Sequence, residues 1–267
     1  MKTYRLPSGK SVTRPHSFMP LVLALIAGMF CLSVIVTGFD ITVLAERGYQ
    51  FFVIIGQMFP PDFSYASDIW EPLLDTIKMS LLGSLIGSVV AIPFAVFAST
   101  NIIKSRVLIA VMRLFLGIVR TIPTLIMALI ATFAFGLGTM AGTVAIAVFT
   151  FAYVGKTLYE QIETVDMGAF EAMEAIGADK VRAFTVAVVP QVIPSYLSIC
   201  LFCFEGNVRY ASILGYVGAG GIGLLLNEKI GWRQYSGVGM ILIMLFLAVL
   251  AIESVSQYLR RRLSKEG

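Results

Sequence analysis

Long runs without a charged residue constrain this chain more than any other feature of its sequence. A helix needs about 20 mostly apolar residues to cross the roughly 30 Å hydrocarbon core of a bilayer. A charge at the bilayer centre costs about 2.5–3.5 kcal/mol, which explains why such segments lack one. The composition agrees, because 58% of the residues are hydrophobic and only 13% are charged. We therefore expect an all-α membrane protein. The charge-free runs are Ser17–Phe39, Met79–Ile103, Thr121–Gly155, Ala183–Phe204 and Gln234–Ile252.

One of these runs, Thr121–Gly155, is too long for a single span. Glycines near its middle are typical of a turn between two helices: Gly136, Gly138 and Gly142. We split the run there and expect the first half to begin near Val107 and the second to continue towards Tyr159. About six transmembrane helices result, or four if this pair only dips into the membrane.

The distribution of Lys and Arg predicts the orientation of the chain. Cationic residues gather in every second connection, whereas the first outer loop, Asp40–Glu71, carries five acidic residues and Arg47. We therefore expect both termini to be cytoplasmic in a bacterial inner membrane. A signal peptide is the alternative for the N-terminus, but its apolar segment is as long as a full span and no clear cleavage site follows. The cations assigned inside are Lys2, Arg5, Lys10, Arg14, Lys104, Arg106, Arg113, Arg120, Lys156, Lys180, Arg182, Arg260, Arg261, Arg262 and Lys265.

Topology also accounts for the net charge of +4. The basic residues lie at the ends of expected spans and not in a patch with exposed aromatics, so we expect lipid contacts and no nucleic acid. Arg106, Arg113 and Arg120 are spaced by seven and share one helical face, which suits a helix along anionic headgroups before the third span. Cys200 and Cys203 fall within a span, and His16 lies in the basic tail, so no metal site is expected.

The segment 160–182 is longer and more patterned than a connector needs to be. Large apolar residues recur every three positions: Phe170, Met173 and Ile176. Glu171 and Glu174 lie beside this face, Gly177 suits a left-handed helix end, and Asp179 suits the N-cap of a following helix. The pattern predicts two short helices at the membrane surface. Since the segment is mostly acidic, it would be repelled by anionic headgroups, and we favour a protein partner.

Part of this segment resembles a known motif. The segment that begins with Glu171-Ala172-Met173 is similar to the EAA loop of ABC importer permeases. Gly177 follows six positions after the Glu, and Pro190 follows thirteen positions after the Gly, as in that motif. That loop docks as a coupling helix into the ATPase subunit. The chain departs from the motif at Met173, Ala187 and Val189, all apolar. The resemblance implies that Glu171 meets a basic residue of the ATPase and that Gly177 permits the bend. The implied ATPase-coupling residues are Phe170, Glu171, Ala172, Met173, Glu174 and Gly177.

Further segments narrow the resemblance to phosphonate-importer permeases over roughly Phe59 to Arg262. They are Pro60–Ser64, Arg120–Pro123, Phe204–Arg209 and Ile213–Gly223. Methionine-type permeases share the glycines of Val217–Gly223 but not the Asn-Val-Arg of this chain, so Asn207 and Arg209 discriminate better. The resemblance implies a type I ABC importer permease fold, a homodimer, two ABC ATPase subunits and an extracytoplasmic substrate-binding protein. It places ATP and Mg on the ATPase and no cofactor on this chain.

A transported oxyanion needs donors that contact it without holding it tightly. Arg209 offers a fork of donors and Asn207 an amide, and we expect Arg209 near the outer end of the fifth span. An ion pair between Arg209 and Glu205 is the structural alternative, and close helix packing is the alternative role of the glycines. The expected translocation path comprises Thr121, Pro123, Asn207, Arg209, Ser212, Gly218 and Gly221.

The predicted organisation has four parts. A basic cytoplasmic tail (1–17) precedes the first transmembrane helix and outer loop (18–70), and the permease core (71–259, with the coupling loop 160–182) precedes a second basic tail (260–267). The sequence lacks a Gly-x4-Gly-Lys-Ser/Thr phosphate loop and a nucleophile elbow, so we expect a transporter subunit and not an enzyme. Phosphonate is the expected substrate, with phosphate and phosphite as alternatives. An ion-coupled secondary transporter is the competing class.

Overall fold

The computed structural model describes residues 3–5, 11–13 and 18–266. Expectations about Lys2, Lys10, Arg14 and His16 in the basic tail lie outside these residues. The chain divides into two compact units, Met1–Gly56 and Gln57–Gly267.

The first unit is a short hairpin followed by two helices. Strands β1 (Thr3–Arg5) and β2 (Ser11–Thr13) pair antiparallel. Helix α1 (Met19–Thr37) is apolar on all sides and leaves its large side chains exposed, as a lipid-facing helix would. It ends at Gly38, whose φ of 62° favours glycine. Helix α2 (Ile41–Gln57) follows, so most of the connection expected as the outer loop over Asp40–Glu71 is helical.

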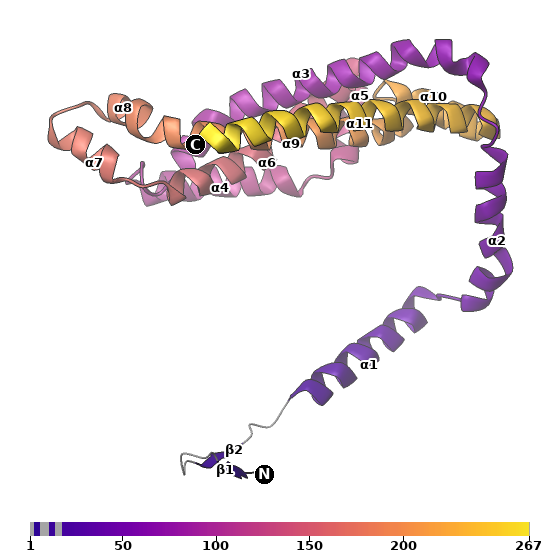
Figure 1. The fold of residues 1–267 in the computed structure, drawn as a ribbon, viewed down its shortest axis with the longest axis horizontal. Coiled ribbons are helices and arrows are strands. Elements are labelled where there is room, and N and C mark those ends of the chain that lie inside the picture. The colour runs from indigo at the N-terminus through magenta and orange to yellow at the C-terminus, as the bar shows by residue number, and fades with distance from the viewer. Residues whose placement is uncertain (1–2, 6–10, 14–17, 267) are drawn as a thin grey trace. The chain divides into compact units, whose positions relative to one another are not determined.

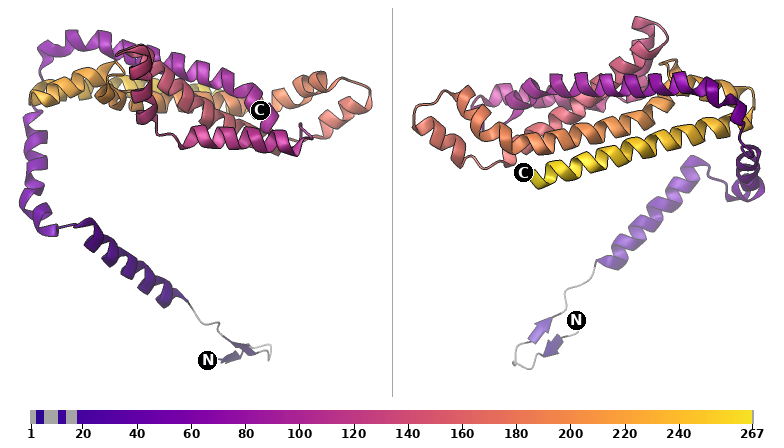
Figure 2. Two further views of the ribbon diagram at one scale, coloured as in Figure 1. Left: turned by 180° about the vertical axis from the view of Figure 1, so that it is seen from behind. Right: turned by 45° about the horizontal axis from the view of Figure 1, so that its top comes forward.

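The second unit is a bundle of long helices that lie side by side, with α7 and α8 protruding at one end and α10 at the opposite end (Figure 1, Figure 2). Its elements in chain order are η1 (Phe63–Tyr65), α3 (Ala66–Ala98), α4 (Arg106–Thr121), α5 (Thr124–Phe135), α6 (Thr139–Thr164), α7 (Gly168–Ala175), α8 (Lys180–Ala183), the π-helical turn η2 (Phe184–Val188), α9 (Val189–Leu214), η3 (Gly215–Val217), α10 (Ile222–Gly231) and α11 (Tyr235–Glu266).

The helices long and apolar enough to span a membrane confirm the prediction of a multi-span all-α protein. Within the described residues five helical segments qualify, and a sixth span is possible by length if α4 and α5 count together. Those two helices meet at 85°, at the break before Pro123, so the expected third span is sharply bent. Pro123 has no N–H to continue the helix and disfavours helical backbone at Ile122, which accounts for the break. Helix α6 has 26 residues and is long enough to cross fully.

Small residues hold the bundle together at its centre. A Cβ atom on Gly87 of α3 would lie 2.4 Å from the carbonyl oxygen of Ala147 on α6, so the two backbones are in direct contact there. Ala91 and Ala95 continue the same buried stripe along α3. Lipid gives no hydrophobic drive for helices to associate, so close van der Waals packing of small residues supplies the stability.

Candidate functional site

The protruding helix pair was predicted from the sequence, and the structure confirms two helices joined at Gly177. Helix α7 ends when Gly177 turns to a φ of 89°, with its N–H donated to the carbonyl of Glu174 and that of Ala178 to Met173. Asp179 stands at the N-cap of α8, but its side chain makes no capping hydrogen bond. The predicted N-cap position is therefore confirmed, but without the capping hydrogen bond that favours Asp there.

Only part of the expected apolar face of α7 is buried. Phe170 packs into a cluster with Leu158 of α6 and Ala187 of η2, and Met173 packs at its edge. Ile176 is instead 78% exposed, because the chain has left the helix at this position. The outward surface of the helix pair presents Glu171, Ala172, Glu174, Ile176 and Gly177. An acidic surface with one exposed apolar side chain suits a basic groove on another protein.

A hydrogen-bond network fixes the base of this helix pair to the bundle. Glu163, in the last turn of α6, accepts hydrogen bonds from the backbone N–H and hydroxyl of Thr100 and from the guanidinium of Arg113. Arg113 also donates from Nε to the carbonyl oxygen of Ala98 at 2.9 Å and lies over the ring of Tyr159. One arginine of α4 thus links the ends of α3 and α6 just before α7 begins.

A second polar cluster lies between α9 and α11. Glu205 is 6% exposed, and each of its carboxylate oxygens faces a different arginine: Oε1 faces Arg209 and Oε2 accepts from Arg260 at 3.0 Å. Arg209 also lies 3.7 Å from Glu253. The structure therefore contains the ion pair that was the structural alternative for Arg209. The Arg209 side chain is nevertheless half exposed, on the side that faces a cavity.

This cavity measures about 350 Å³ and opens between α6 and α9. Four aromatic side chains line it, and Arg209 contributes the exposed charge. Arg209 lies near the C-terminal end of α9. It is level with the middle of α6, because Asn207, two residues earlier, donates to Thr150. The lining residues are Phe149, Tyr153, Phe202, Cys203, Glu205, Gly206, Asn207, Arg209 and Tyr210.

Asn207 lies next to this cavity, but its amide is directed into the bundle. The residue is 2% exposed, and its Nδ2 donates to Ser84 Oγ of α3 at 2.8 Å and to Thr150 Oγ1 of α6 at 2.9 Å. Three helices are thereby joined at one level. A buried amide in an apolar bundle must be paired, so in this conformation the side chain positions α9 and does not offer a donor to a ligand.

The other expected path residues lie in three places. Thr121 and Pro123 stand at the bend between α4 and α5, away from the α6–α9 cavity. Ser212 is half-buried on α9 and donates to the carbonyl of Arg209. Gly218 and Gly221 lie in the turn before α10, both at positive φ. A Cβ on Gly221 would approach Thr76 Oγ1 to 2.4 Å, so this glycine permits close packing of backbone on α3.

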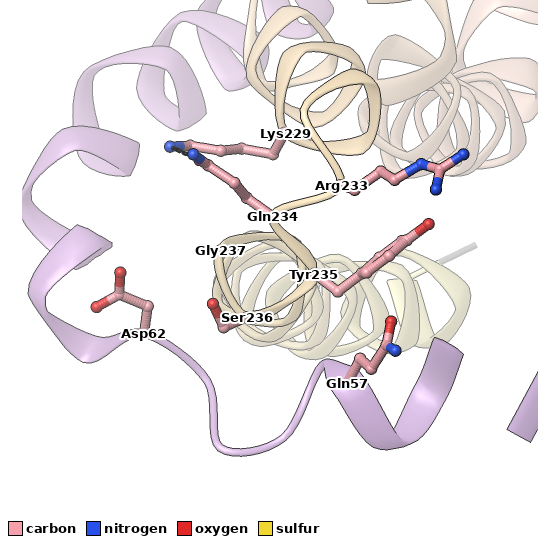
Figure 3. Close-up of a pocket in the computed structure, with 8 residues that line it drawn as sticks. All are labelled: Gln57, Asp62, Lys229, Arg233, Gln234, Tyr235, Ser236 and Gly237. Carbon is pink, nitrogen blue, oxygen red and sulfur yellow. Dashed lines mark hydrogen bonds between the residues drawn. The ribbon is translucent and has the colours of Figure 1, made fainter. Parts of the chain in front are cut away.

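At the end of the unit opposite α7, a polar pocket of about 700 Å³ is lined by Gln57, Asp62, Lys229, Arg233, Gln234, Tyr235, Ser236 and Gly237 (Figure 3). Lys229 lies over the ring of Tyr65 and donates to Gln234, whereas Arg233 adopts a φ of 55°, rare for a non-glycine residue. Hydrogen bonds from Ser64 hold the pKa of the Asp62 carboxyl below its ordinary value. The pocket therefore presents both signs of charge at neutral pH.

Two site features were missed by the sequence analysis. Arg113 was expected only as a headgroup contact, yet it bonds to Glu163, fifty residues further along the chain. Arg260 was assigned to a basic tail, yet it pairs with Glu205. An acidic residue inside an apolar span predicts a cationic partner, and this signal was present for Glu205. Spacing along the chain does not identify the partner.

Comparison with known families decides the identity of this fold. The family described as "Binding-protein-dependent transport system inner membrane component" matches residues 83–265, which include the helix pair, the Glu205 cluster and most of α11. The chain belongs to this family. It is 33% identical over 240 residues to the phosphite transport system permease protein PtxC of Stutzerimonas stutzeri, covering 90% of this chain and 87% of that protein.

Two further relatives are similar to this chain to different extents. The phosphate-import permease protein PhnE of Mycolicibacterium smegmatis is 34% identical over 211 residues, and the alignment covers 79% of this chain but only 40% of that longer protein. The probable D-methionine permease protein MetI of Vibrio cholerae is more distant, at 25% identity over 203 residues, with 70% of this chain and 88% of that protein covered.

Solved structures agree on the fold. An inward-facing structure of the MetNI methionine ABC transporter contains a chain that aligns with a TM-score of 0.66 at 20% identity, covering 76% of this chain and 99% of the other. An amino acid ABC transporter crystallised with histidines aligns with a TM-score of 0.61, also at 20% identity, covering 75% and 98%. The fold is thus that of a type I ABC importer permease.

Proposed function

We propose that this chain is the permease subunit of an ATP-driven importer for phosphonate or a related small phosphorus oxyanion. The observation that carries the proposal is the exposed acidic helix pair anchored to the bundle through Glu163 and Arg113. Such an element has a rigid base and a free, charged tip, as a part that transmits movement from a separate motor to the bundle would need.

The proposed partners rest on the family of the chain together with this arrangement. The tip of α7 contacts one ATPase subunit, two copies of the chain form the pore, and each carries its own helix pair. The ATPase lies in the cytoplasm, and so does the helix pair that it contacts. The Lys and Arg residues of the two tails favour the same side for both chain termini. The polar pocket around Arg233 then lies at the outer face, where an extracytoplasmic binding protein delivers substrate (Figure 3). Catalysis of ATP hydrolysis and the binding of Mg belong to the ATPase.

The substrate class rests on two observations. Relatives at 33–34% identity are named for phosphite transport and phosphate import. The half-exposed guanidinium of Arg209 in the α6–α9 cavity is a suitable donor for a phosphorus oxyanion. Phosphonate remains our first assignment, with phosphite and phosphate as the alternatives.

Uptake by a reconstituted complex tests the function. The chain is placed in vesicles with its ATPase and binding protein, and entry of labelled methylphosphonate, phosphite and phosphate is measured with and without ATP. We expect uptake of at least one anion that requires ATP and the binding protein. Uptake driven by a proton or sodium gradient without ATP would contradict the proposal and favour a secondary transporter.

A further inference from the structure

A third cavity, of about 410 Å³, lies between α4 and α6 and has a cationic lining. Its walls are formed by Arg113, Leu116, Gly117, Arg120, Thr121, Lys156 and Tyr159. Three cations therefore converge on one hollow near the end of the bundle that carries the helix pair. Thr121, expected on the path, lies here and not with Arg209.

The three cations are not equally available to a ligand. Arg113 is held by Glu163 and by the carbonyl of Ala98, so its role is structural. Lys156 pairs with Glu160 at 3.3 Å, with side chains 40% and 52% exposed, and an exposed pair of this kind is weak. Arg120 forms no ion pair within the part of the chain that the structure describes. Arg120 and Lys156 can therefore turn to a passing anion.

Helix α6 connects this hollow to the cavity of Arg209. Phe149 and Tyr153 line the Arg209 cavity, and Lys156 lines the hollow between α4 and α6. These positions are spaced i, i+4 and i+7, so they lie on one face of the helix. The rise from Tyr153 to Lys156 is only about 4.5 Å. This face of α6 thus extends from the Arg209 cavity to the cavity between α4 and α6, in the direction of the helix pair.

We propose that the pocket formed by Arg120, Thr121 and Lys156 is a transit site for a phosphate-like oxyanion, reached from Arg209 along the Phe149–Lys156 face of α6. The inference rests on the proposed function, because the anion is the transported substrate. Two cationic sites in series, each with low affinity, let an anion pass from one to the next without being bound tightly at either. Glu160 and Glu163 keep the net charge of the second site low, which limits how tightly it binds.

The test uses the full complex in phosphatidylcholine vesicles with inorganic phosphate, phosphite and methylphosphonate as probes. The double variant Arg120→Gln/Lys156→Gln should lower the initial uptake rate about tenfold while leaving assembly with the ATPase intact. The charge-retaining double variant Arg120→Lys/Lys156→Arg should have most of the wild-type uptake rate. A purely structural role of the two side chains would not predict this recovery. Arg106→Gln, an exposed arginine on α4 that does not line the pocket, is the matched control and should match the wild type.

A lipid headgroup carries the same phosphate chemistry, and a second set of vesicles separates the two sources. If the double variant is slower only when phosphatidylglycerol is present, the pocket binds lipid and the proposal is overturned. Equal rates for the wild type and the double variant in both lipids would also overturn it, while leaving the proposed function intact. A wild-type complex that moves none of the three anions would instead refute the proposed function, and this inference with it.

Discussion

Arg260, near the end of α11, donates a 3.0 Å hydrogen bond to the carboxylate of Glu205 on α9, fifty-five residues earlier in the chain. Glu205 is buried, and Arg209 occupies its other oxygen. A buried carboxylate that loses one of two partners keeps its desolvation cost and loses part of its compensation.

We therefore predict that Arg260→Gln lowers the free energy of unfolding by about 1–3 kcal/mol. The measurement is thermal unfolding of the purified protein in detergent, where the midpoint should fall by several degrees. Arg261→Gln is the control, since Arg261 is exposed and forms no ion pair among the described residues. If both variants have the same unfolding midpoint as the wild type, the Arg260–Glu205 pair does not stabilise the protein.

Asn207 should be replaceable only at a cost in stability. Asn207→Leu conserves the volume approximately but removes the donors to Ser84 and Thr150, and we expect a loss of about 1–3 kcal/mol. Ser212→Ala, which removes a hydroxyl bonded only to its own helix, should change stability by less than about 0.5 kcal/mol. A neutral Asn207→Leu variant with impaired uptake would show instead that the amide acts on the substrate.

The turn before α10 should not tolerate a side chain at position 221. Gly221→Ala would place a methyl group 2.4 Å from Thr76 Oγ1, at a φ of 70° that disfavours other residues, so we expect a loss of about 2 kcal/mol. Gly206→Ala is the matched control, because its added methyl meets nothing within 4 Å and lies in a helix, where alanine is favoured. Similar unfolding midpoints for the two variants would contradict the close contact.

Arg113 should control how firmly the helix pair is held. Arg113→Lys keeps the charge, but an ammonium group cannot donate to both the Ala98 carbonyl and Glu163 in the geometry of the guanidinium. The free energy of local unfolding of the helix pair should therefore fall by about 1 kcal/mol. Hydrogen exchange of amides in residues 168–183 should then be about fivefold faster, with exchange at the α3–α6 centre unchanged. Arg106→Lys should leave exchange in both regions as in the wild type.

The sequence predicted what depends on local rules. Gly177 predicted the break between α7 and α8, whereas the 85° bend at Pro123 lies inside a segment that we expected to be one span. Burial of Phe170 followed from helical spacing, but the exposure of Ile176 did not, because it depends on where α7 ends. The pairs Arg113–Glu163 and Arg260–Glu205 join residues far apart in the chain, and only the packing of α3, α4, α6, α9 and α11 brings them together.

The most direct test of the central claim is charge reversal at the tip of the helix pair. Glu171 is exposed, so Glu171→Arg should leave the unfolding midpoint unchanged while abolishing both co-purification with the ATPase and ATP-dependent uptake. Glu228→Arg, an exposed charge reversal on α10 at the other end of the unit, is the control and should retain ATPase binding. If Glu171→Arg binds the ATPase and supports uptake as the wild type does, α7 is not the coupling element.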